Sequence, residues 1–410
     1  MISVNKVELL APAGNLEKLK VALIYGADAV YIGGKKFGLR AFGGNFSNDE
    51  LKTGVDFAHS MDRKVYVTVN IFAHNEDIDE LPDYLRYLDE IGVDAVLISD
   101  LGVFSLAKDV TKNLELHVST QANVTNYKTV EMWQKLGANR VVLARELSQA
   151  EIVGIKNHCD VELEMFVHGA MCISYSGRCY LSHYLTGRDG NKGECTHSCR
   201  WKYNLVEEKR PGEYFEVDED EHGAYVMNSK DLCLLPCIDK VIESGVSSLK
   251  IEGRMKSVHY VASVVKVYRE AIDSYYAGQF HIKDEWLDEL DKVAHRPYTS
   301  GFFVNDENGT MIHDSSKAKQ SSTFLGIVRE FDTSTNIGIV EQRGKLEIGQ
   351  KIEVLQPQGQ TFSQILTAMT DEDDNSINAA PHAQQIVKIK FNKSVQPWSL
   401  IRTLDSDNYV

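Results

Sequence analysis

The heptapeptide Gly26-Ala-Asp-Ala-Val-Tyr-Ile32 decides the fold, because variants of it return three more times along the chain. The later copies are GVDAVLI from Gly92, GANRVVL from Gly137 and GVSSLKI from Gly245. Glycine adopts the left-handed conformation that ends a helix, and the apolar run after it can be buried on both faces of a parallel sheet. Each copy therefore predicts a helix that ends at glycine and leads into a buried strand.

Outward from these copies, short apolar runs alternate with stretches of helical periodicity. Eight strands with crossover helices favour a (β/α)8 TIM-like barrel, and an open doubly wound sheet remains the alternative because strand order cannot be read from the sequence. The predicted strands are Val7–Leu10, Ala29–Gly33, Val65–Asn70, Ala95–Asp100, Leu114–Thr120, Arg140–Ala144, Val161–His168 and Ser248–Glu252. The predicted helices include Leu16–Tyr25, Asp79–Ile91, Tyr127–Leu136, Leu235–Glu243 and Val258–Tyr276.

The alternation is interrupted once, between the seventh and eighth predicted strands. Residues 169–229 hold a cysteine-rich segment and two β-like runs around the acidic tract Glu216–Glu221, which predicts an insertion on the face where barrel active sites are built. We therefore expect a catalytic barrel over 1–280 and a connecting helix and linker over 281–322. Short strands with Gly and Asn turns predict a small antiparallel β-barrel over 323–410.

The amino-acid composition and the net charge narrow the classes of protein and partner that are compatible with this sequence. Of 410 residues, 43% are hydrophobic and 25% charged, which is typical of a soluble globular protein. The net charge is −15, so a nucleic-acid partner would have to bind at a local basic patch. No stretch approaches eighteen uncharged apolar residues and no signal peptide is evident, so we expect a cytoplasmic protein with no membrane span.

Four of the seven cysteines, Cys172, Cys179, Cys195 and Cys199, fall in the predicted insertion. Four soft thiolates in flexible loops favour zinc or an iron–sulfur cluster, and unligated thiols are the third possibility. The paired Cys-x2-Cys spacing of zinc knuckles is absent, which weakens the zinc interpretation. By contrast, Cys233 and Cys237 lie four residues apart among leucines and are expected to pack on the apolar face of a helix.

Polar residues follow several predicted strands, where a barrel's ligand would bind. They are Asn70 and His74 after the third strand, Ser119, Gln121 and Asn123 after the fifth, His168 after the seventh, and Glu252 and Arg254 after the eighth. Arg254 is the best candidate to bind a carboxylate, since a guanidinium pairs with it through two hydrogen bonds. The alternative is an Arg254–Glu252 or Arg254–Asp pair that only braces the rim. His168 could transfer protons or donate a hydrogen bond, or be a satisfied rim residue.

One local concentration of basic residues lies beside the aromatic residues Trp201 and Tyr203. Its members are Lys192, Arg200, Lys202, Lys209 and Arg210. Basic and aromatic side chains together suit a splayed RNA base and its phosphates, although a solvated surface explains any single lysine equally well. Gly33-Gly34 and Gly43-Gly44 match neither a P-loop nor a dinucleotide fingerprint and are expected to provide loop flexibility.

Several motifs resemble those of the collagenase-like peptidase family (peptidase family U32) along nearly the whole chain. They are Leu9-Leu-Ala-Pro-Ala-Gly-Asn15, Ala27-Asp-Ala-Val-Tyr-Ile-Gly33, His168-Gly-Ala-Met-Cys172, Ser176-Gly-Arg-Cys179, Asn191-Lys-Gly-Glu-Cys195, Cys199-Arg-Trp201 and Lys250-Ile-Glu-Gly-Arg254. The resemblance implies a [4Fe-4S] cluster on Cys172, Cys179, Cys195 and Cys199. From their positions at the predicted strand ends we expect catalytic roles for His168 and Glu252. Substrate-binding roles are expected for Asn70, Gln121, Arg178 and Arg254, and RNA-binding roles for Lys192, Arg200 and Lys202.

The better understood members that this chain resembles are oxygen-independent hydroxylases of tRNA, ribosomal RNA or the ubiquinone precursor. The length and the C-terminal domain are most similar to the branch that makes 5-hydroxyuridine at the tRNA wobble position, which implies prephenate as co-substrate and a tRNA anticodon loop as partner. A homo-oligomer, or a hetero-oligomer with a related subunit, is compatible with this interpretation. The alternatives are a peptidase or other hydrolase, a hydroxylase of another substrate, and a noncatalytic metal-bound scaffold. No His-Glu-x-x-His or Gly-x-Ser-x-Gly motif supports a peptidase.

Overall fold

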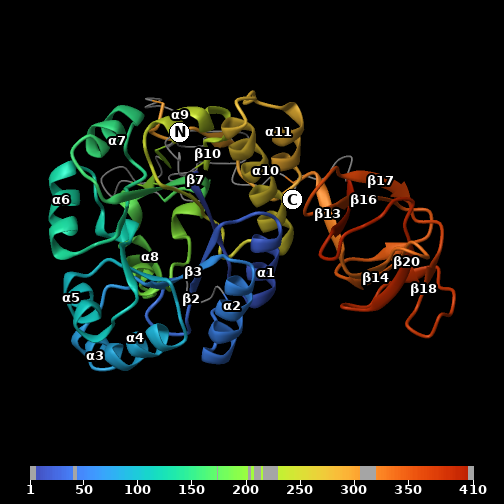
Figure 1. Ribbon diagram of the computed structural model, residues 1–410, viewed down its shortest axis with the longest axis horizontal. Helices are drawn as coiled ribbons and strands as arrows, with labels where there is room; N and C mark the ends of the chain where they lie inside the picture. The colour runs from blue at the N-terminus through green and yellow to red at the C-terminus, as the bar shows by residue number, and fades with distance from the viewer. Residues whose placement is uncertain are drawn as a thin grey trace.

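The structure is a computed structural model that describes residues 6–39, 44–172, 174–201, 205–206, 214–215, 230–304 and 320–404. Eight parallel strands form a closed barrel, because the eighth strand pairs with both the seventh and the first. This closure confirms the (β/α)8 prediction and excludes the open doubly wound sheet (Figure 1). The barrel strands are β1 (Glu8–Pro12), β2 (Ala29–Gly33), β3 (Lys64–Val69), β4 (Ala95–Ile98), β5 (Glu115–Val118), β6 (Arg140–Val142), β7 (Glu162–Ala170) and β11 (Ser248–Ile251).

Helices surround the barrel as the repeated glycine motif predicts. Gly26, Gly92, Gly137 and Gly245 all have positive φ angles, between 83° and 113°, at the end of a helix. The surrounding helices are α1 (Leu16–Ile24), α2 (Asn48–Ser60), α4 (Leu81–Glu90), α5 (Leu101–Val110), α6 (Tyr127–Leu136), α7 (Gln149–Lys156), α9 (Ile238–Glu243) and α10 (Val258–Tyr276). The single helix expected over Asp79–Ile91 is preceded by a short α3 (Asn75–Ile78). No helix among the described residues is long and apolar enough to cross a membrane.

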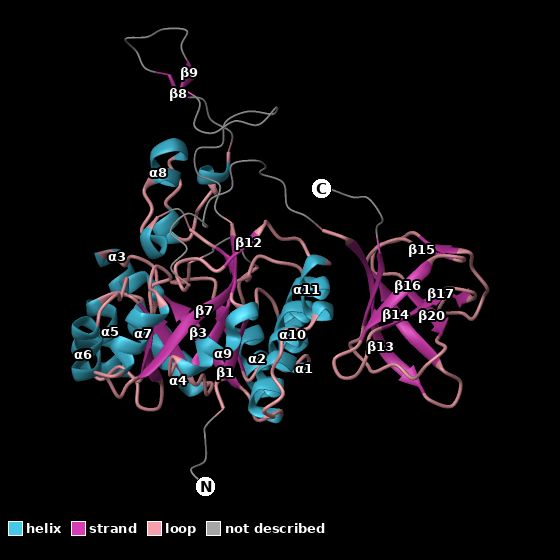
Figure 2. Ribbon diagram, turned by 90° about the horizontal axis from the view of Figure 1, so that it is seen from above, coloured by secondary structure: helices cyan, strands magenta, loops and turns pink. Residues whose placement is uncertain are grey.

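The cysteine-rich insertion follows β7, as predicted, and stands above one end of the barrel (Figure 2). Its described part is made of short elements, so loops set the positions of its side chains. They are the 3-10 turns η2 (Tyr175–Gly177), η3 (Gly190–Lys192) and η4 (Ser198–Arg200), the helix α8 (Leu181–Thr186), and the paired strands β8 (Leu205–Val206) and β9 (Tyr214–Phe215).

Two short strands beside β7 were not anticipated. β10 (Asp231–Cys233) pairs antiparallel with the end of β7, and β12 (Tyr298–Thr299) pairs parallel with β10. The expectation that Cys233 and Cys237 share a helix face is therefore wrong, since Cys233 lies in β10 and Cys237 in the 3-10 turn η5 (Leu235–Cys237). Both thiols are nevertheless buried, as the leucine-rich context indicated.

The C-terminal domain is a curled antiparallel sheet of seven strands, which confirms the predicted class and refines the barrel to a half-barrel. Its edge strands, β17 (Phe362–Ile365) and β18 (Met369–Thr370), are not paired with each other in the described sheet. The side chain of Gln364 reaches from β17 to the backbone of Lys390 and Asn392. The strands are β13 (Ser322–Asp332), β14 (Ile337–Gln342), β16 (Lys351–Leu355), β17 (Phe362–Ile365), β18 (Met369–Thr370), β20 (Ile386–Lys390) and β21 (Leu400–Leu404), with a separate pair, β15 (Leu346–Glu347) and β19 (Ala379–Ala380).

This domain packs beside α10 and α11 (Asp284–Asp291) through a mixed apolar and ionic interface (Figure 1). The apolar side chains Ile327, Leu355 and Leu400 join the hydrophobic core of the barrel domain. The fully buried Arg402 of β21 binds the carboxylate of Glu289 in α11 at 2.5–2.7 Å. Tyr25 also donates its hydroxyl to the carbonyl of Leu355 at 2.9 Å.

Candidate functional site: a cysteine-lined pocket at the barrel mouth

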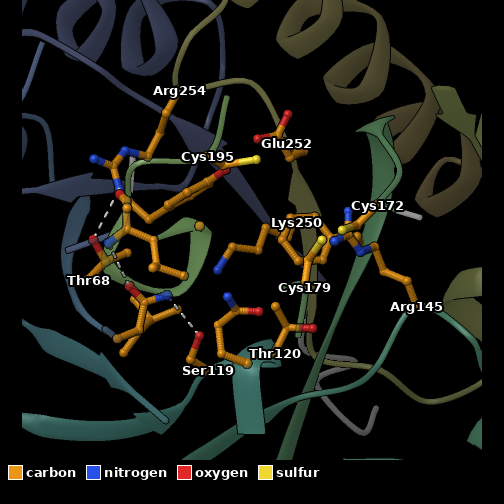
Figure 3. A pocket seen from close by; sticks show the side chains of 18 residues that line it. Thr68, Ser119, Thr120, Arg145, Cys172, Cys179, Cys195, Lys250, Glu252 and Arg254 are labelled. Atoms are coloured by element: carbon orange, nitrogen blue, oxygen red, sulfur yellow. Dashed lines mark hydrogen bonds between the residues drawn. The ribbon is translucent and has the colours of Figure 1, made fainter. Parts of the chain in front are cut away.

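A cavity of about 150 Å³ opens where the barrel strands end, beneath the cysteine-rich insertion (Figure 3). Four of the side chains expected to bind or transform a substrate line it together, and they follow three different barrel strands, β3, β5 and β11. They are Asn70, Gln121, Glu252 and Arg254. The carboxyl ends of the strands are where barrel enzymes carry their catalytic groups. The structure therefore brings these four residues together at the strand ends, and their roles stay predictions.

Asn70 connects three loops at the pocket wall. Its amide nitrogen donates to Ser119 Oγ at 3.1 Å, and its amide oxygen accepts from the backbone N–H of Leu39 at 3.2 Å. Ser119 also lines the pocket, immediately before the 3-10 turn η1 (Thr120–Ala122) that carries Gln121. These bonds fix the loops after β2, β3 and β5 relative to one another.

Arg254 lies three residues after β11, as expected, and is 3% exposed. One guanidinium nitrogen donates to Leu39 O at 2.9 Å and to Thr68 Oγ1 at 3.1 Å, and the other donates to Asn45 Oδ1 at 2.5 Å. The guanidinium thus connects the loop after β2 to β3 while it lines the cavity.

Gly33 and Gly34 lie where polar side chains approach the backbone closely. A Cβ atom at Gly33 would come within 2.4 Å of Arg254 Nη2, and a Cβ at Gly34 within 2.1 Å of the hydroxyl of Tyr84. The expectation that Gly33-Gly34 provides loop flexibility is therefore wrong, because Gly33 is the last residue of β2 and both glycines make room for packed polar groups.

His168 lies inside β7 rather than after it, since the strand continues to Ala170. The pairing of β7 with β11 changes register between Phe166, opposite Lys250, and His168, opposite Ile251, so one extra residue is inserted. Such a bulge breaks the alternation of side chains. Phe166 lines the pocket, whereas the imidazole of His168 packs against Tyr260, Tyr268 and Tyr298 outside the described pocket lining. Burial lowers the pKa of His168 to about 3, so the ring is neutral near pH 7.

The remaining candidates are Arg178 of the insertion and the strand-end residues Asn123 and His74. Arg178 is exposed and donates to the carbonyls of Gln121 and Ala122 at 3.4 Å, which connects the insertion to η1. Asn123 follows η1 in the left-handed conformation. His74 begins α3, and its backbone N–H donates to Asp77 Oδ2 at 2.8 Å. None of these three is among the described residues that line the pocket.

Three of the four insertion cysteines, Cys172, Cys179 and Cys195, line the same cavity as Arg254 (Figure 3). Cys199 lies in η4, four residues further along the chain. The backbone N–H of His197 donates to Cys195 Sγ at 3.4 Å. No group of three or more His, Cys, Asp or Glu side chains in the described part of the chain surrounds a single point at metal-binding distance. The donor set fits a thiolate-bound cluster, and the ligand assignment stays a prediction.

The insertion is fastened to the barrel by hydrogen bonds that the motif residues provide. Ser176 donates its backbone N–H and its hydroxyl to Glu146, at 2.7 and 2.6 Å. Phe72, after β3, donates its N–H to Asn191 O at 3.1 Å. The conspicuous Ser-Gly-Arg-Cys and Asn-Lys-Gly-Glu-Cys stretches therefore hold the cysteines over the barrel mouth.

The predicted basic patch is only partly described. Lys192 lies at the rim and pairs with Glu76 Oε1 at 3.2 Å and more distantly with Asp77, so carboxylates compensate its charge. The side chains of Arg200, Lys202, Lys209 and Arg210 lie outside the described residues. Large exposed side chains gather on the same insertion: Tyr175, Tyr180, Tyr184, Leu185 and Trp201.

Comparison with known proteins agrees with the motifs. The model of "Peptidase family U32" matches residues 14–313, and that of "Peptidase family U32 C-terminal domain" matches residues 320–402. The chain belongs to peptidase family U32. This U32 chain is 45% identical to tRNA hydroxylation protein P1 of Bacillus subtilis, over 97% of its own length and 95% of the relative's. It is 38% identical to tRNA hydroxylation protein P of Escherichia coli over 86% and 87% of the two lengths. The 23S rRNA 5-hydroxycytidine C2501 synthase of Escherichia coli is 33% identical over 80% of this chain and 48% of that protein.

Sequence reasoning missed several side chains that line the U32 pocket. They are Tyr31, Thr68, Arg145, Phe166 and Lys250. Lys250 was detectable, because alternation along a strand places residues 250 and 252 on the same face. Arg145 was harder to detect, because it lies in a loop and no periodicity indicates where its side chain points. Counting Arg145, Lys250 and Arg254 against Glu252, the described lining has an excess of positive charge.

Proposed function

We propose that this U32 chain hydroxylates a tRNA base, converting the wobble uridine to 5-hydroxyuridine without molecular oxygen. The observation that carries the proposal is one cavity that brings together three cysteines of the insertion and the polar groups at the strand ends. The names of the relatives from Bacillus subtilis and Escherichia coli, tRNA hydroxylation proteins over most of both chains, support tRNA as the substrate.

A [4Fe-4S] cluster and prephenate belong to the same proposal. Cys172, Cys179, Cys195 and Cys199 would hold the cluster, which supplies electron transfer when bound. Arg254 would bind a carboxylate of the co-substrate, and the amides of Asn70 and Gln121 would orient it. Glu252 is the carboxylate of the described lining and is proposed to accept a proton. The imidazole of His168 stays neutral and buried. The backbone carbonyl of His168 accepts the N–H of Glu252 at 2.8 Å and so positions that residue.

Several features of the insertion support an RNA substrate in spite of the net charge of −15. Tyr180 and Tyr184 are 65% and 76% exposed, and Trp201 is 46% exposed. Exposed aromatic rings next to basic side chains stack unpaired bases, and a base in an anticodon loop is already partly unstacked. Peptide hydrolysis has less support, because the described lining of the pocket includes no histidine that could act as base to a serine or cysteine nucleophile.

The deciding experiment measures 5-hydroxyuridine in total tRNA by mass spectrometry. A strain that lacks this gene and any paralogue should lose the modified base, and the intact gene should restore it. Cys195→Ala should fail to restore it, while Cys233→Ala should succeed. An unaltered 5-hydroxyuridine content in the deletion strain would show that the RNA assignment is wrong.

The cluster is tested separately by anaerobic purification. We expect iron, acid-labile sulfide and a brown colour, which Cys172→Ala, Cys179→Ala, Cys195→Ala or Cys199→Ala should each abolish. Stoichiometric zinc with no labile sulfide would contradict the cluster but leave the tRNA assignment to the first experiment.

A further inference from the structure

Lys250 is a buried cation in the middle of the pocket. It is the third residue of β11 and is 3% exposed, yet its side chain is part of the cavity lining. Figure 3 shows it between the Arg254 side of the cavity and the side that carries Cys179. It comes from a barrel strand, whereas Glu252 and Arg254 of the same lining follow that strand.

An ionic network below the pocket holds this ammonium in place. Lys250 Nζ donates to Glu164 Oε1 at 2.7 Å, and the other oxygen of Glu164 accepts from Arg140 Nη1 at 3.3 Å. Arg140 also binds Glu8 and Glu162 at 2.6 and 2.7 Å. Burial alone would raise the pKa of Glu164, but Lys250 and Arg140 outweigh it and lower that pKa. The carboxylate therefore stays ionised and anchors Lys250 from beneath.

Aromatic rings form the sides of the lysine's environment. Lys250 Nζ lies 4.3 Å from the ring centroid of Tyr31 and 5.5 Å from that of Phe166. Such rings attract a cation through their faces. Tyr31 is itself fixed, because its hydroxyl donates to Ile251 O at 3.0 Å. The side chain is therefore held in one orientation, with few alternative positions for its ammonium.

The ammonium has more hydrogen-bonding capacity than this network uses. A lysine ammonium carries three N–H donors, and within the described residues its hydrogen bond is the one to Glu164. Burial lowers the pKa of Lys250, and Glu164 opposes that shift. A buried cation with unused donors next to a cavity is stabilised when a negatively charged oxygen fills the cavity.

We propose that Lys250 is a catalytic residue that binds a carboxylate of the small molecule reacting in this pocket, with Glu164 as its positioning residue. The ligand class is a dicarboxylate, because Arg254 and Lys250 line one cavity from two sides and Arg145 adds a third positive charge. The inference rests on the proposed function, because it takes this pocket as the reaction site and its ligand class includes the proposed co-substrate, prephenate.

A purely structural role for Lys250 makes a different prediction. If the lysine only neutralised Glu164, then Lys250→Met would destabilise the fold by leaving a buried carboxylate less compensated. Removing both charges together in Lys250→Met/Glu164→Gln would then restore stability and ligand binding alike. If Lys250 binds the ligand, the double variant regains its melting temperature but still binds poorly.

The test uses the anaerobically purified protein and isothermal titration with prephenate and with malonate, the smallest stable dicarboxylate probe. We expect Lys250→Met to raise the dissociation constants at least tenfold, and the double variant to keep that defect with a melting temperature near that of the wild type. Lys256→Met is the matched control, since Lys256 also lies over a tyrosine ring, at 5.0 Å from Tyr260, but does not line the described cavity.

The outcomes separate this inference from the proposed function. Lys250-dependent binding of either probe, combined with no 5-hydroxyuridine in the complemented strain, would overturn the hydroxylation proposal and retain the role of Lys250. Wild-type affinity in Lys250→Met or in the double variant would overturn the role of Lys250. A wild-type protein that binds neither probe would overturn it as well.

Discussion

At the scale of single residues, the pocket depends on how little space surrounds Arg254. Its guanidinium is held by Leu39, Thr68 and Asn45, and it occupies the space that a Cβ at Gly33 would enter. An arginine presents five donors in a planar fork, whereas a lysine presents a compact point charge. A lysine at position 254 would therefore keep the positive charge but lose the planar arrangement of donors, so the two contributions can be measured separately.

We predict that Arg254→Lys lowers tRNA hydroxylation at least tenfold while the protein still folds, because the charge remains but bidentate binding of a carboxylate is lost. The measurement is 5-hydroxyuridine in tRNA from the complemented deletion strain, with the melting temperature of the purified variant as the folding control. Hydroxylation at the wild-type level would assign Arg254 to bracing the loop after β2.

At the scale of elements, the barrel was predictable because its pattern is local. Each repeated glycine ends a helix and each apolar run forms a strand, so the positions of β2, β4, β6 and β11 follow from neighbouring residues. The bulge in β7 was not predictable, since it arises from pairing with β11, more than eighty residues away. That one inserted residue turned His168 out of the pocket and made its sequence-based assignment misleading.

The candidate site likewise contains residues whose positions the sequence predicts and residues whose positions it does not. Residues directly after strands, such as Asn70, Gln121, Glu252 and Arg254, could be assigned to one pocket because a barrel brings all strand ends to one face. The loops that carry Cys172, Cys179 and Cys195 have no periodicity, so their convergence depended on motif resemblance. The role of Gly33 could not be read from the sequence, because the group that approaches it, Arg254, follows β11 and is distant along the chain.

The contact between β21 and helices α10 and α11 yields a prediction about stability. Arg402 is fully buried and binds Glu289 and Glu353, and it also contacts His259 at 2.9 Å. Arg402→Ala should lower the free energy of unfolding by about 3–5 kcal/mol, because two carboxylates lose their shared buried partner. Urea denaturation measures the change. Lys52→Ala, which removes an exposed pair with Asp56, is the control and should cost less than about 1 kcal/mol. Equal effects of the two substitutions would contradict the ionic interface.

At the scale of the whole molecule, buried histidines set the response of stability to acid. Burial lowers the pKa of His168 and of His259 to about 3, and it also lowers the pKa of His117 and His295. Unfolded histidines have pKa values near 6.5, so below that pH the unfolded chain binds protons that the folded chain excludes. Stability is therefore retained above pH 6.5 and is lost as the pH falls toward 3.

We predict that His168 and His259 each remove about 2 kcal/mol of stability between pH 7 and pH 5. Urea denaturation of the wild type at these two pH values should show the loss, and His168→Gln should reduce it by the share of one histidine. A stability that stays constant or rises toward pH 5 would contradict the assignment of these rings as buried and neutral.

If tRNA is the substrate, this negatively charged protein has to bind a negatively charged polymer. A net charge of −15 opposes binding to phosphates at long range, so tRNA affinity should rest on a few local contacts and on stacking. Each phosphate contact removed should lower the slope of log affinity against log salt by about 0.9. Lys192→Ala and the pair Arg200→Ala/Lys202→Ala should therefore reduce the slope. Tyr184→Ala, which removes an exposed ring, should weaken binding by about 1–3 kcal/mol without changing the slope.

Filter binding of unmodified tRNA between 50 and about 200 mM salt separates these two contributions, because only the ionic one depends on salt. Lys52→Ala is the control for a lysine on helix α2, away from the insertion, and should alter neither slope nor affinity. If Tyr184→Ala bound as the wild type did and the Lys192, Arg200 and Lys202 variants kept the wild-type slope, the insertion would not be the tRNA-binding surface. The pocket would then have to receive its uridine from another face of the molecule.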